Sequence, residues 1–186
     1  DILEIGNFYG PDRETWRYDA GQGAFLKGNG KGDFEALPKS KSGFFDVKGL
    51  GTFRHINSRL QGHPTTHEGL PGIRIASGSL GQGISVAIGA ALAKKLNGDD
   101  KLVYCLTGDG ELQEGQIWEA LLFASAKKVD NLIVTVDWND AQIDGSTQQV
   151  CDLGDLKAKF TAFGFDVLEM NGNVMEDVVF TLTEAQ

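Results

Sequence analysis

Asp109 and Asn139 are the residues of this sequence whose types and spacing point most directly to chemistry. Asp109 lies between two glycines in LTGDGELQEGQIWEA (106–120), directly after a short apolar run. Asn139 lies in VDWND (136–140), after the next apolar run and thirty residues later. If the two runs are neighbouring parallel strands, their carboxyl ends lie roughly 5 Å apart, which brings a carboxylate and an amide oxygen together. With phosphate oxygens added, these ligands suit Mg²⁺ or Ca²⁺.

The same two residues also fit a role that involves no metal. Aspartate and asparagine are common in the turns that follow strands, and a glycine on each side of Asp109 is typical of such a turn. The spacing leaves room for one crossover helix between the strands. It does not by itself separate a metal ligand from a turn residue, so both roles remain open on spacing alone.

Two further motifs contain residue types that occur in binding sites. GSLGQG (78–83) precedes a helical pattern, and such a glycine-rich loop either cradles a phosphate or lets the helix pack closely. QGHP (61–64) places His63 beside a rigid turn. A lone histidine is more often structural or solvated than catalytic, so neither motif decides the function alone.

Apolar spacing predicts alternating strands and helices from about residue 50 onward. Strands are predicted at 101–107, 131–137 and 165–170, and helices within 80–98, 115–128, 155–164 and the last dozen residues. Gly98 is the predicted stop of the first helix. The expected core positions of the first two helices are Ile84, Ala87, Ile88, Ala91, Leu92 and Leu96, and Ile117, Leu121, Leu122 and Ala126. This alternation predicts an α/β fold with a doubly wound, mostly parallel sheet and helices on both faces.

Residues 1–49 have a different composition, rich in glycine, aromatic and turn residues. They predict short strands separated by turns, so the composition places a domain boundary between 49 and 50. The turn in KGNGKGDF (27–34) resembles that of one blade of the FG-GAP/VCBS propeller repeats. Asn29 and Asp33 in this turn also allow a calcium loop, but a lysine between them and the lack of further carboxylates favour a simple turn.

The net charge and the composition of the chain limit the classes of partner that it can bind. The 186 residues carry a formal net charge of -9 and no block of Lys or Arg, which argues against nucleic acid or an anionic membrane as the main partner. No apolar run approaches the roughly 20 residues that span a bilayer, and no signal peptide is visible. Cys105 lies inside an apolar run and is expected to be a buried free thiol, which favours a reducing compartment.

Four segments together resemble the N-terminal, thiamine-diphosphate-binding domain of transketolase. They are FRHINSRLQGHP, GSLGQGISVAIGAALAKK, GDGELQEGQIWEA and NDAQIDG, and they occur in the family's order from about residue 50 to the end. The resemblance implies thiamine diphosphate and Mg²⁺ as cofactors. It also implies a cytoplasmic location, whereas the shorter propeller resemblance implies an extracellular one, and the larger match is preferred. VDWND departs from the family's pattern because Asp140 adds a carboxylate beside Asn139.

The resemblance also implies a role for individual residues. Asp109 and Asn139 would bind Mg²⁺ through their side chains, and Ala141 through its carbonyl. His63 would face the cofactor and substrate, and Glu114 would lie towards a subunit interface. The residues implied to surround the cofactor are Gly78, Ser79, Leu80, Gly81, Gly108, Asp109, Gly110, Glu111, Asn139 and Ile143.

The activity implied by the resemblance is two-carbon ketol transfer between sugar phosphates. In the family the cofactor also contacts a pyrimidine-binding domain, usually from a partner subunit, so a homo- or heterodimer is expected. That domain and several family histidines lie outside residues 50–186, so the site is expected to be incomplete alone. The alternatives are a non-catalytic fusion or interaction protein, and another class of thiamine-diphosphate enzyme, which QGHP, GSLGQG and QIDG disfavour.

Overall fold

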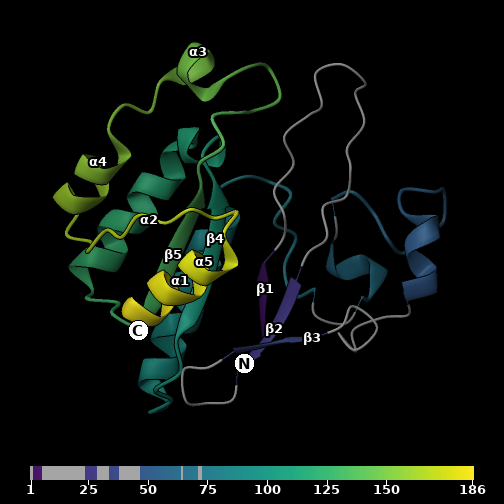
Figure 1. The fold of residues 1–186 in the computed structure, drawn as a ribbon, viewed down its shortest axis with the longest axis horizontal. Coiled ribbons are helices and arrows are strands. Elements are labelled where there is room, and N and C mark those ends of the chain that lie inside the picture. Colours follow the sequence, from purple (N-terminus) through teal and green to yellow (C-terminus); the bar gives the residue numbers. More distant parts are fainter. Residues whose placement is uncertain (1, 6–23, 29–33, 38–46, 64, 71–72) are drawn as a thin grey trace. The chain divides into compact units, whose positions relative to one another are not determined.

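The structure is a computed structural model that describes residues 2–5, 24–28, 34–37, 47–63, 65–70 and 73–186 (Figure 1). The chain divides into two compact units, Asp1–Ser79 and Leu80–Gln186, and each is described by itself. No helix within the described ranges is both long and apolar enough to cross a membrane.

The first unit contains a small antiparallel sheet. Its strands are β1 (Ile2–Ile5), β2 (Ala24–Gly28) and β3 (Phe34–Leu37), and β2 lies between the other two. The predicted strand-and-turn pattern is thus confirmed for these segments. The turn at 29–33, for which the sequence favours a simple turn over a calcium loop, lies outside the described residues, and the propeller resemblance stays a prediction.

Two short 3-10 helices follow in the first unit, η2 (Val47–Thr52) and η3 (Thr66–Glu68). A reciprocal cap fixes the start of η3, because the Thr65 hydroxyl accepts from the His67 N–H and the Glu68 carboxylate accepts from the Thr65 N–H. The Arg59 guanidinium donates to the Glu68 and Gly69 carbonyls at the end of η3. These bonds hold the segment on either side of His63 in a defined path.

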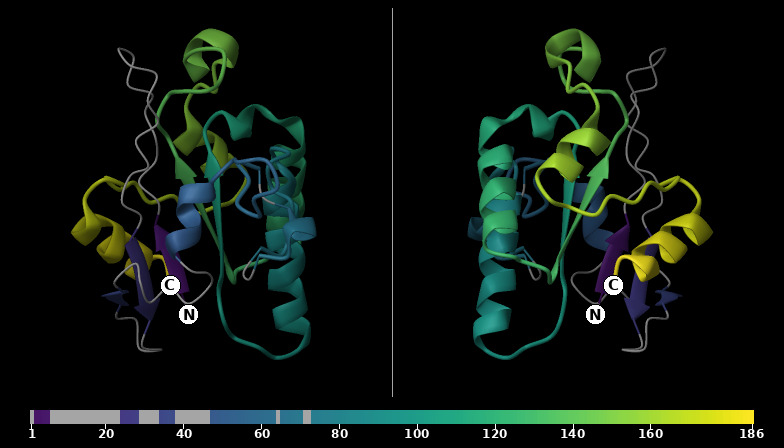
Figure 2. Two further views of the ribbon diagram at one scale, coloured as in Figure 1. Left: turned by 90° about the vertical axis from the view of Figure 1, so that its right-hand side faces the viewer. Right: turned by 90° about the vertical axis from the view of Figure 1, so that its left-hand side faces the viewer.

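The second unit is built on two parallel strands, β4 (Val103–Gly108) and β5 (Leu132–Asp137). Helices α1 (Gln82–Leu96) and α2 (Gly115–Ala126) pack against each other on one side of the strands, and α5 (Met175–Glu184) lies on the other side (Figure 2). The remaining elements are η4 (Glu111–Gln113), α3 (Thr147–Cys151) and α4 (Leu156–Ala162). The predicted α/β fold with a parallel sheet and helices on both faces is confirmed.

The core lies between β4, α1, α2 and α4. Its fully buried side chains include Ile84, Ile117 and Leu121, each worth roughly 1.5–3 kcal/mol of burial. Trp118 and Phe160 join α2 to α4 with ring centroids 5.7 Å apart. On the opposite face of β4 the Tyr104 hydroxyl accepts from the Gln186 side chain, which fixes the chain end after α5.

Several predicted details of this unit are wrong. The segment 165–170 is not a strand: no described strand pairs with it, and Phe165 and Val167 instead pack against the core as part of a connection. Leu96 and Leu122 are exposed at 87% and 62%, because each lies beyond the stripe of its helix that faces the strands, and Ala126 is exposed as well. The predicted stop at Gly98 is confirmed, since this glycine takes φ +66° after the last turn of α1.

The two cysteines differ in accessibility, and this difference tests the placement of β4. Cys105 is buried, and burial, with a smaller contribution from the charge of Glu111, raises the pKa of its thiol to about 11. Cys151 is exposed.

At pH 8 we expect an aromatic disulfide reagent to label one thiol per chain rapidly and the second only after denaturation. Cys151→Ser should remove the fast phase; equal rapid labelling of both thiols would contradict the buried position of Cys105.

Candidate functional site

The pairing of β4 with β5 brings the two predicted ligand turns together. In the register of the strands Gly108 is opposite Asp137, and the Asp109 N–H continues the ladder by donating to the Asp137 carbonyl at 3.0 Å. The turns that begin with Asp109 and Asn139 therefore leave the sheet side by side. The predicted proximity of the two turns is confirmed, while the role of Asp109 and Asn139 as metal ligands stays a prediction.

Asp109 is a buried carboxylate held by backbone N–H groups. It is 1% exposed, its Oδ1 accepts from the Gly110 N–H at 2.8 Å, and its Oδ2 accepts from the Asp140 N–H at 2.7 Å. A buried charge without a partner is strongly unfavourable, and these two charge-assisted bonds only partly replace its hydration. Each oxygen keeps a lone pair, so the side chain can still bind a cation.

Asn139 and Ala141 form the facing turn. The Asn139 amide donates to Asp137 Oδ2 at 2.9 Å, and its Oδ1 accepts from the Ala141 N–H at 2.9 Å. The Ala141 carbonyl oxygen lies 3.6 Å from the position that a Cβ on Gly110 would occupy. The carbonyl of Ala141 thus borders Gly110, and the amide of Asn139 connects Asp137 with Ala141.

Gly110 is required by this close approach. A Cβ at Gly110 would lie 2.8 Å from the Cβ of Gln142, closer than side-chain carbons come to one another. Gln142 also carries a buried side-chain nitrogen with no hydrogen-bond partner among the described residues. Its other amide atom, Oε1, accepts from the Asp144 N–H at 3.2 Å, which fixes the orientation of the amide. A free donor beside Gly110 suits an anionic oxygen.

Glu111 joins the glycine loop to the end of β4. Its Oε1 accepts from the Gly81 N–H at 2.7 Å, and its Oε2 accepts from the Gly108 N–H at 3.2 Å. The sequence predicts that Glu111 lies against a diphosphate, and in the structure its carboxylate holds two backbone segments. The long sequence separation between residues 81 and 111 explains why spacing alone does not reveal this contact.

Gln116 is a second support of the loop that the sequence analysis missed. Its side-chain nitrogen donates to the Leu80 carbonyl at 2.8 Å, and its oxygen accepts from the Gln82 side chain at 3.2 Å. Gly81 has φ +82°, and a Cβ there would lie 2.6 Å from the Gln116 nitrogen. The polar side chain of Gln116 in the first turn of α2, within the ELQEGQ motif, is the only sequence signal that it supports the loop.

The loop ends where α1 begins with an open N-terminus. Gly81 occupies the capping position, and no side chain in the described part of the chain caps the helix. The first N–H groups of a 15-residue helix, with the positive end of its dipole, favour an anionic group at this point. This arrangement agrees with the predicted phosphate-cradling role of GSLGQG.

The remaining predicted site residues are placed as follows. Within the first unit, the imidazole of His63 packs against Gly78, because a Cβ on Gly78 would lie 2.9 Å from His63 Cδ2. Within the second unit, Leu80 is 46% exposed and Ile143 is 99% exposed, so both are free to contact a ligand. Ser79 and Glu114 are also exposed.

The electrostatics at the strand ends favour a cation. Burial raises the pKa of the Asp137 carboxyl above its ordinary value, the negative charge of Asp109 raises it further, and the hydrogen bond from Asn139 opposes both. Mutual repulsion between nearby carboxylates is the condition that a bound cation relieves.

The donor set suits a hard cation that is shared with an anionic ligand. Among the residues that the structure describes, no group of three or more His, Cys, Asp or Glu side chains is placed to hold a metal. One carboxylate, one amide oxygen and one backbone carbonyl remain, and Mg²⁺ would complete its six oxygens with water and phosphate. The residues present therefore fit a Mg²⁺–diphosphate pair.

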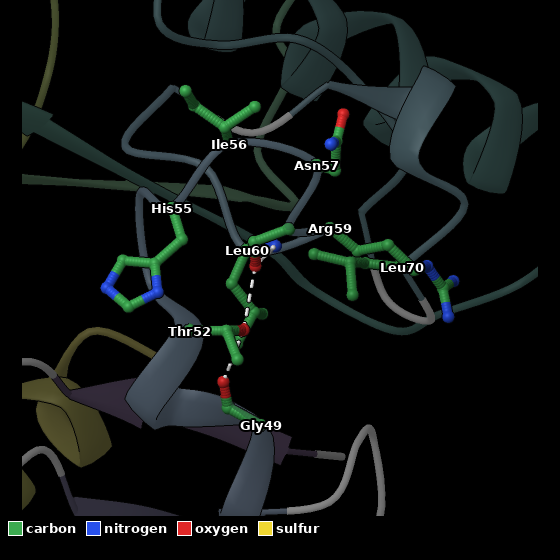
Figure 3. A pocket seen from close by; sticks show the side chains of 9 residues that line it. Gly49, Thr52, His55, Ile56, Asn57, Arg59, Leu60 and Leu70 are labelled. Carbon is green, nitrogen blue, oxygen red and sulfur yellow. Dashed lines mark hydrogen bonds between the residues drawn. The ribbon is translucent and has the colours of Figure 1, made fainter.

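A separate hollow lies in the first unit. It has a volume of about 500 Å³ and is lined by residues that include Thr52, His55, Asn57 and Arg59 (Figure 3). The Thr52 hydroxyl donates to the Gly49 carbonyl at 2.8 Å, and Arg59 is already bound to two carbonyls. None of the predicted site residues lines this hollow.

Known proteins similar to this chain agree on one family. The model of the family "Transketolase, thiamine diphosphate binding domain" matches residues 39–186. An apulose-4-phosphate transketolase subunit of Actinobacillus succinogenes is 41% identical over 160 residues, which cover 86% of this chain and 57% of that protein. The 6-deoxy-6-sulfo-D-fructose transketolase subunit SqwG of a Clostridium species is 38% identical, over 77% of this chain and 52% of that protein.

Solved structures give the same result. The crystal structure of transketolase from Campylobacter jejuni superposes with a TM-score of 0.67 at 37% identity, over 75% of this chain and 23% of that chain. This chain spans about half the length of the curated relatives that it matches. The family match begins at residue 39, before the boundary predicted near residue 50.

The role of Glu111 in joining the glycine loop to the end of β4 can be tested by measuring the free energy of unfolding. Glu111→Ala leaves the Gly81 and Gly108 N–H groups without their acceptor, so we expect a loss of about 1–3 kcal/mol in the free energy of unfolding. Glu119→Ala on the exposed side of α2 is the matched control and should change it by less than about 0.5 kcal/mol. Urea denaturation of both variants measures the difference; equal stabilities would show that Glu111 does not hold the loop.

Proposed function

This chain belongs to the transketolase family through its thiamine diphosphate binding domain, and we propose on that premise that it binds thiamine diphosphate with Mg²⁺ at the carboxyl ends of β4 and β5. The observation that carries the proposal is the buried carboxylate of Asp109 beside the Asn139–Ala141 turn. This carboxylate has hydrogen bonds to N–H groups and no cationic partner among the described residues, so a divalent ion would complete its environment.

Each residue of the proposed site has a distinct task. The side chains of Asp109 and Asn139 and the carbonyl of Ala141 would hold Mg²⁺, and the metal would in turn bind the diphosphate. Gly110 allows the backbone to approach this group closely, and the open N-terminus of α1 supplies a positive dipole. The bound cofactor supplies the carbanion chemistry, and the protein supplies position and electrostatics.

Residues outside the metal turn would contact the rest of the cofactor and the substrate. Leu80 and Ile143 offer exposed apolar side chains, which suit the ring portion of the cofactor. His63, packed on Gly78 at the start of the glycine loop, would orient substrate hydroxyls or move a proton. We propose Glu114, exposed before α2, as part of a subunit contact.

The proposed activity is transfer of a two-carbon ketol unit between sugar phosphates. Because the chain spans about half of the curated relatives that it matches, we propose that a pyrimidine-binding domain or subunit completes the site in trans. The names of these relatives describe them as transketolase subunits, which supports assembly with a partner. The free thiols fit a reducing, cytoplasmic location.

Cofactor binding tests the metal site. With Mg²⁺ present, thiamine diphosphate should raise the melting temperature of the chain, and Asn139→Ala should weaken binding about tenfold or more, since it removes one ligand but little buried structure. Asp109→Ala should abolish the shift, and Asp166→Ala, an exposed position, is the matched control. No shift in the parent chain, with Asp109→Ala behaving identically, would refute the metal site and favour the alternative of a non-catalytic interaction protein.

Reconstitution tests the need for a partner. We expect ketol transfer, followed through a coupled aldehyde assay, only when the chain is mixed with a pyrimidine-binding subunit. The chain alone and the partner alone are the controls. Turnover by this chain alone would contradict the proposed incompleteness of its site.

A further inference from the structure

Asp140 is the carboxylate that the sequence adds beside the predicted metal ligands, and its side chain accepts hydrogen bonds from residues of α3. Its Oδ1 accepts from the Thr147 hydroxyl at 2.6 Å and from the Gln148 N–H at 3.4 Å. Its backbone N–H meanwhile donates to Asp109 Oδ2 at 2.7 Å. One residue therefore connects the buried carboxylate at the end of β4 with the first turn of α3.

The backbone of Asp140 is in an unfavourable region. Its φ of +53° is left-handed, a conformation that glycine adopts freely and that other residues adopt at a cost, with Asp and Asn the best tolerated. A residue stays there only when surrounding contacts hold it. The hydrogen bonds from Thr147 and Gln148 are those contacts.

The hydroxyl of Thr147 lies near two carboxylates, those of Asp140 and Asp109. Thr147 is 3% exposed, and its hydroxyl lies 2.6 Å from Asp140 Oδ1 and 3.5 Å from Asp109 Oδ2. A hydroxyl has one proton to donate, and the shorter contact receives it. The proton of Thr147 is thus kept on Asp140, and the second lone pair of Asp109 Oδ2 stays free.

We propose that Asp140 and Thr147 are positioning residues for the metal site: the Asp140 carboxylate engages the Thr147 hydroxyl and so keeps it from occupying the cation-binding lone pair of Asp109. This inference rests on the proposed function, because it concerns how Asp109 binds a divalent ion. It assigns to Asp140 no direct contact with the metal. Without the Asp140 side chain, the buried hydroxyl turns to Asp109 Oδ2 and competes with the cation.

Divalent-ion affinity in a set of variants tests the inference. The probe is Mn²⁺ binding to the full chain at saturating thiamine diphosphate, measured by the loss of the free-ion signal in electron paramagnetic resonance. Asp140→Ala should weaken Mn²⁺ binding about tenfold, the usual scale for a residue that supports a ligand. Asp140→Asn should bind like the parent chain, because the amide oxygen can accept from Thr147.

The double variant separates competition from simple loss of structure. Thr147→Val in the Asp140→Ala background removes the competing hydroxyl, so it should restore most of the lost Mn²⁺ binding, because the effects of two residues in contact are not additive. Asp140→Gly relieves the strained φ and should be more stable than Asp140→Ala, yet it should bind Mn²⁺ equally weakly. A purely structural role predicts that stability and affinity change together.

Each contrary result has a definite meaning. Weak binding by Asp140→Asn, with no recovery when Thr147→Val is added to Asp140→Ala, would identify Asp140 as a direct or electrostatic ligand and overturn the inference. Parent-like binding by Asp140→Ala would overturn it as well, while leaving the proposed function intact. Absence of Mn²⁺ binding by the parent chain would overturn the proposed function and this inference together.

Discussion

The parallel pairing of β4 with β5 is the interaction on which the rest of the site depends. With Gly108 opposite Asp137, the strands end at the same level, and each is followed at once by a polar turn. A slip of one residue would exchange the faces of the strand, exposing Cys105 and burying Tyr104, so the core against α1 and α2 fixes the register. The packing of the core thereby sets the position of Asp109 relative to Asn139.

A buried carboxylate at that point requires support, and several neighbours are organised around it. Backbone N–H groups of Gly110 and Asp140 bind the two oxygens of Asp109, and the Thr147 hydroxyl, 3.5 Å from Oδ2, donates to Asp140 instead. The Glu111 carboxylate joins Gly81, before the first turn of α1, to Gly108 at the end of β4. These contacts support the proposal of a metal–anion site at this edge of the strands.

The sequence was sufficient to predict what depends on local pattern. Short apolar runs indicated β4 and β5, helical spacing indicated α1 and α2, and the order of the turns brought Asp109 next to Asn139. The segment 165–170 failed because an apolar run predicts burial, not a pairing partner. Counting Leu122 as core failed because it is adjacent to the buried Leu121, and adjacent residues cannot both face one side of a helix; Ala126 follows Leu122 by four residues on the same exposed side. Glu111 and Gln116 bind backbone groups 30 or more residues away, and the strand order that brings Asp109 to Asn139 does not predict which side chains make such contacts.

The proposed metal site is tested by crystals of the chain grown with Mn²⁺ and thiamine diphosphate, in which the metal can be located. An anomalous difference map should show one manganese peak at bonding distance from side-chain oxygens of both Asp109 and Asn139, with the Asp140 carboxylate still bound to Thr147. A peak at any other group of residues, or a cofactor bound with no metal between these two turns, would contradict the account.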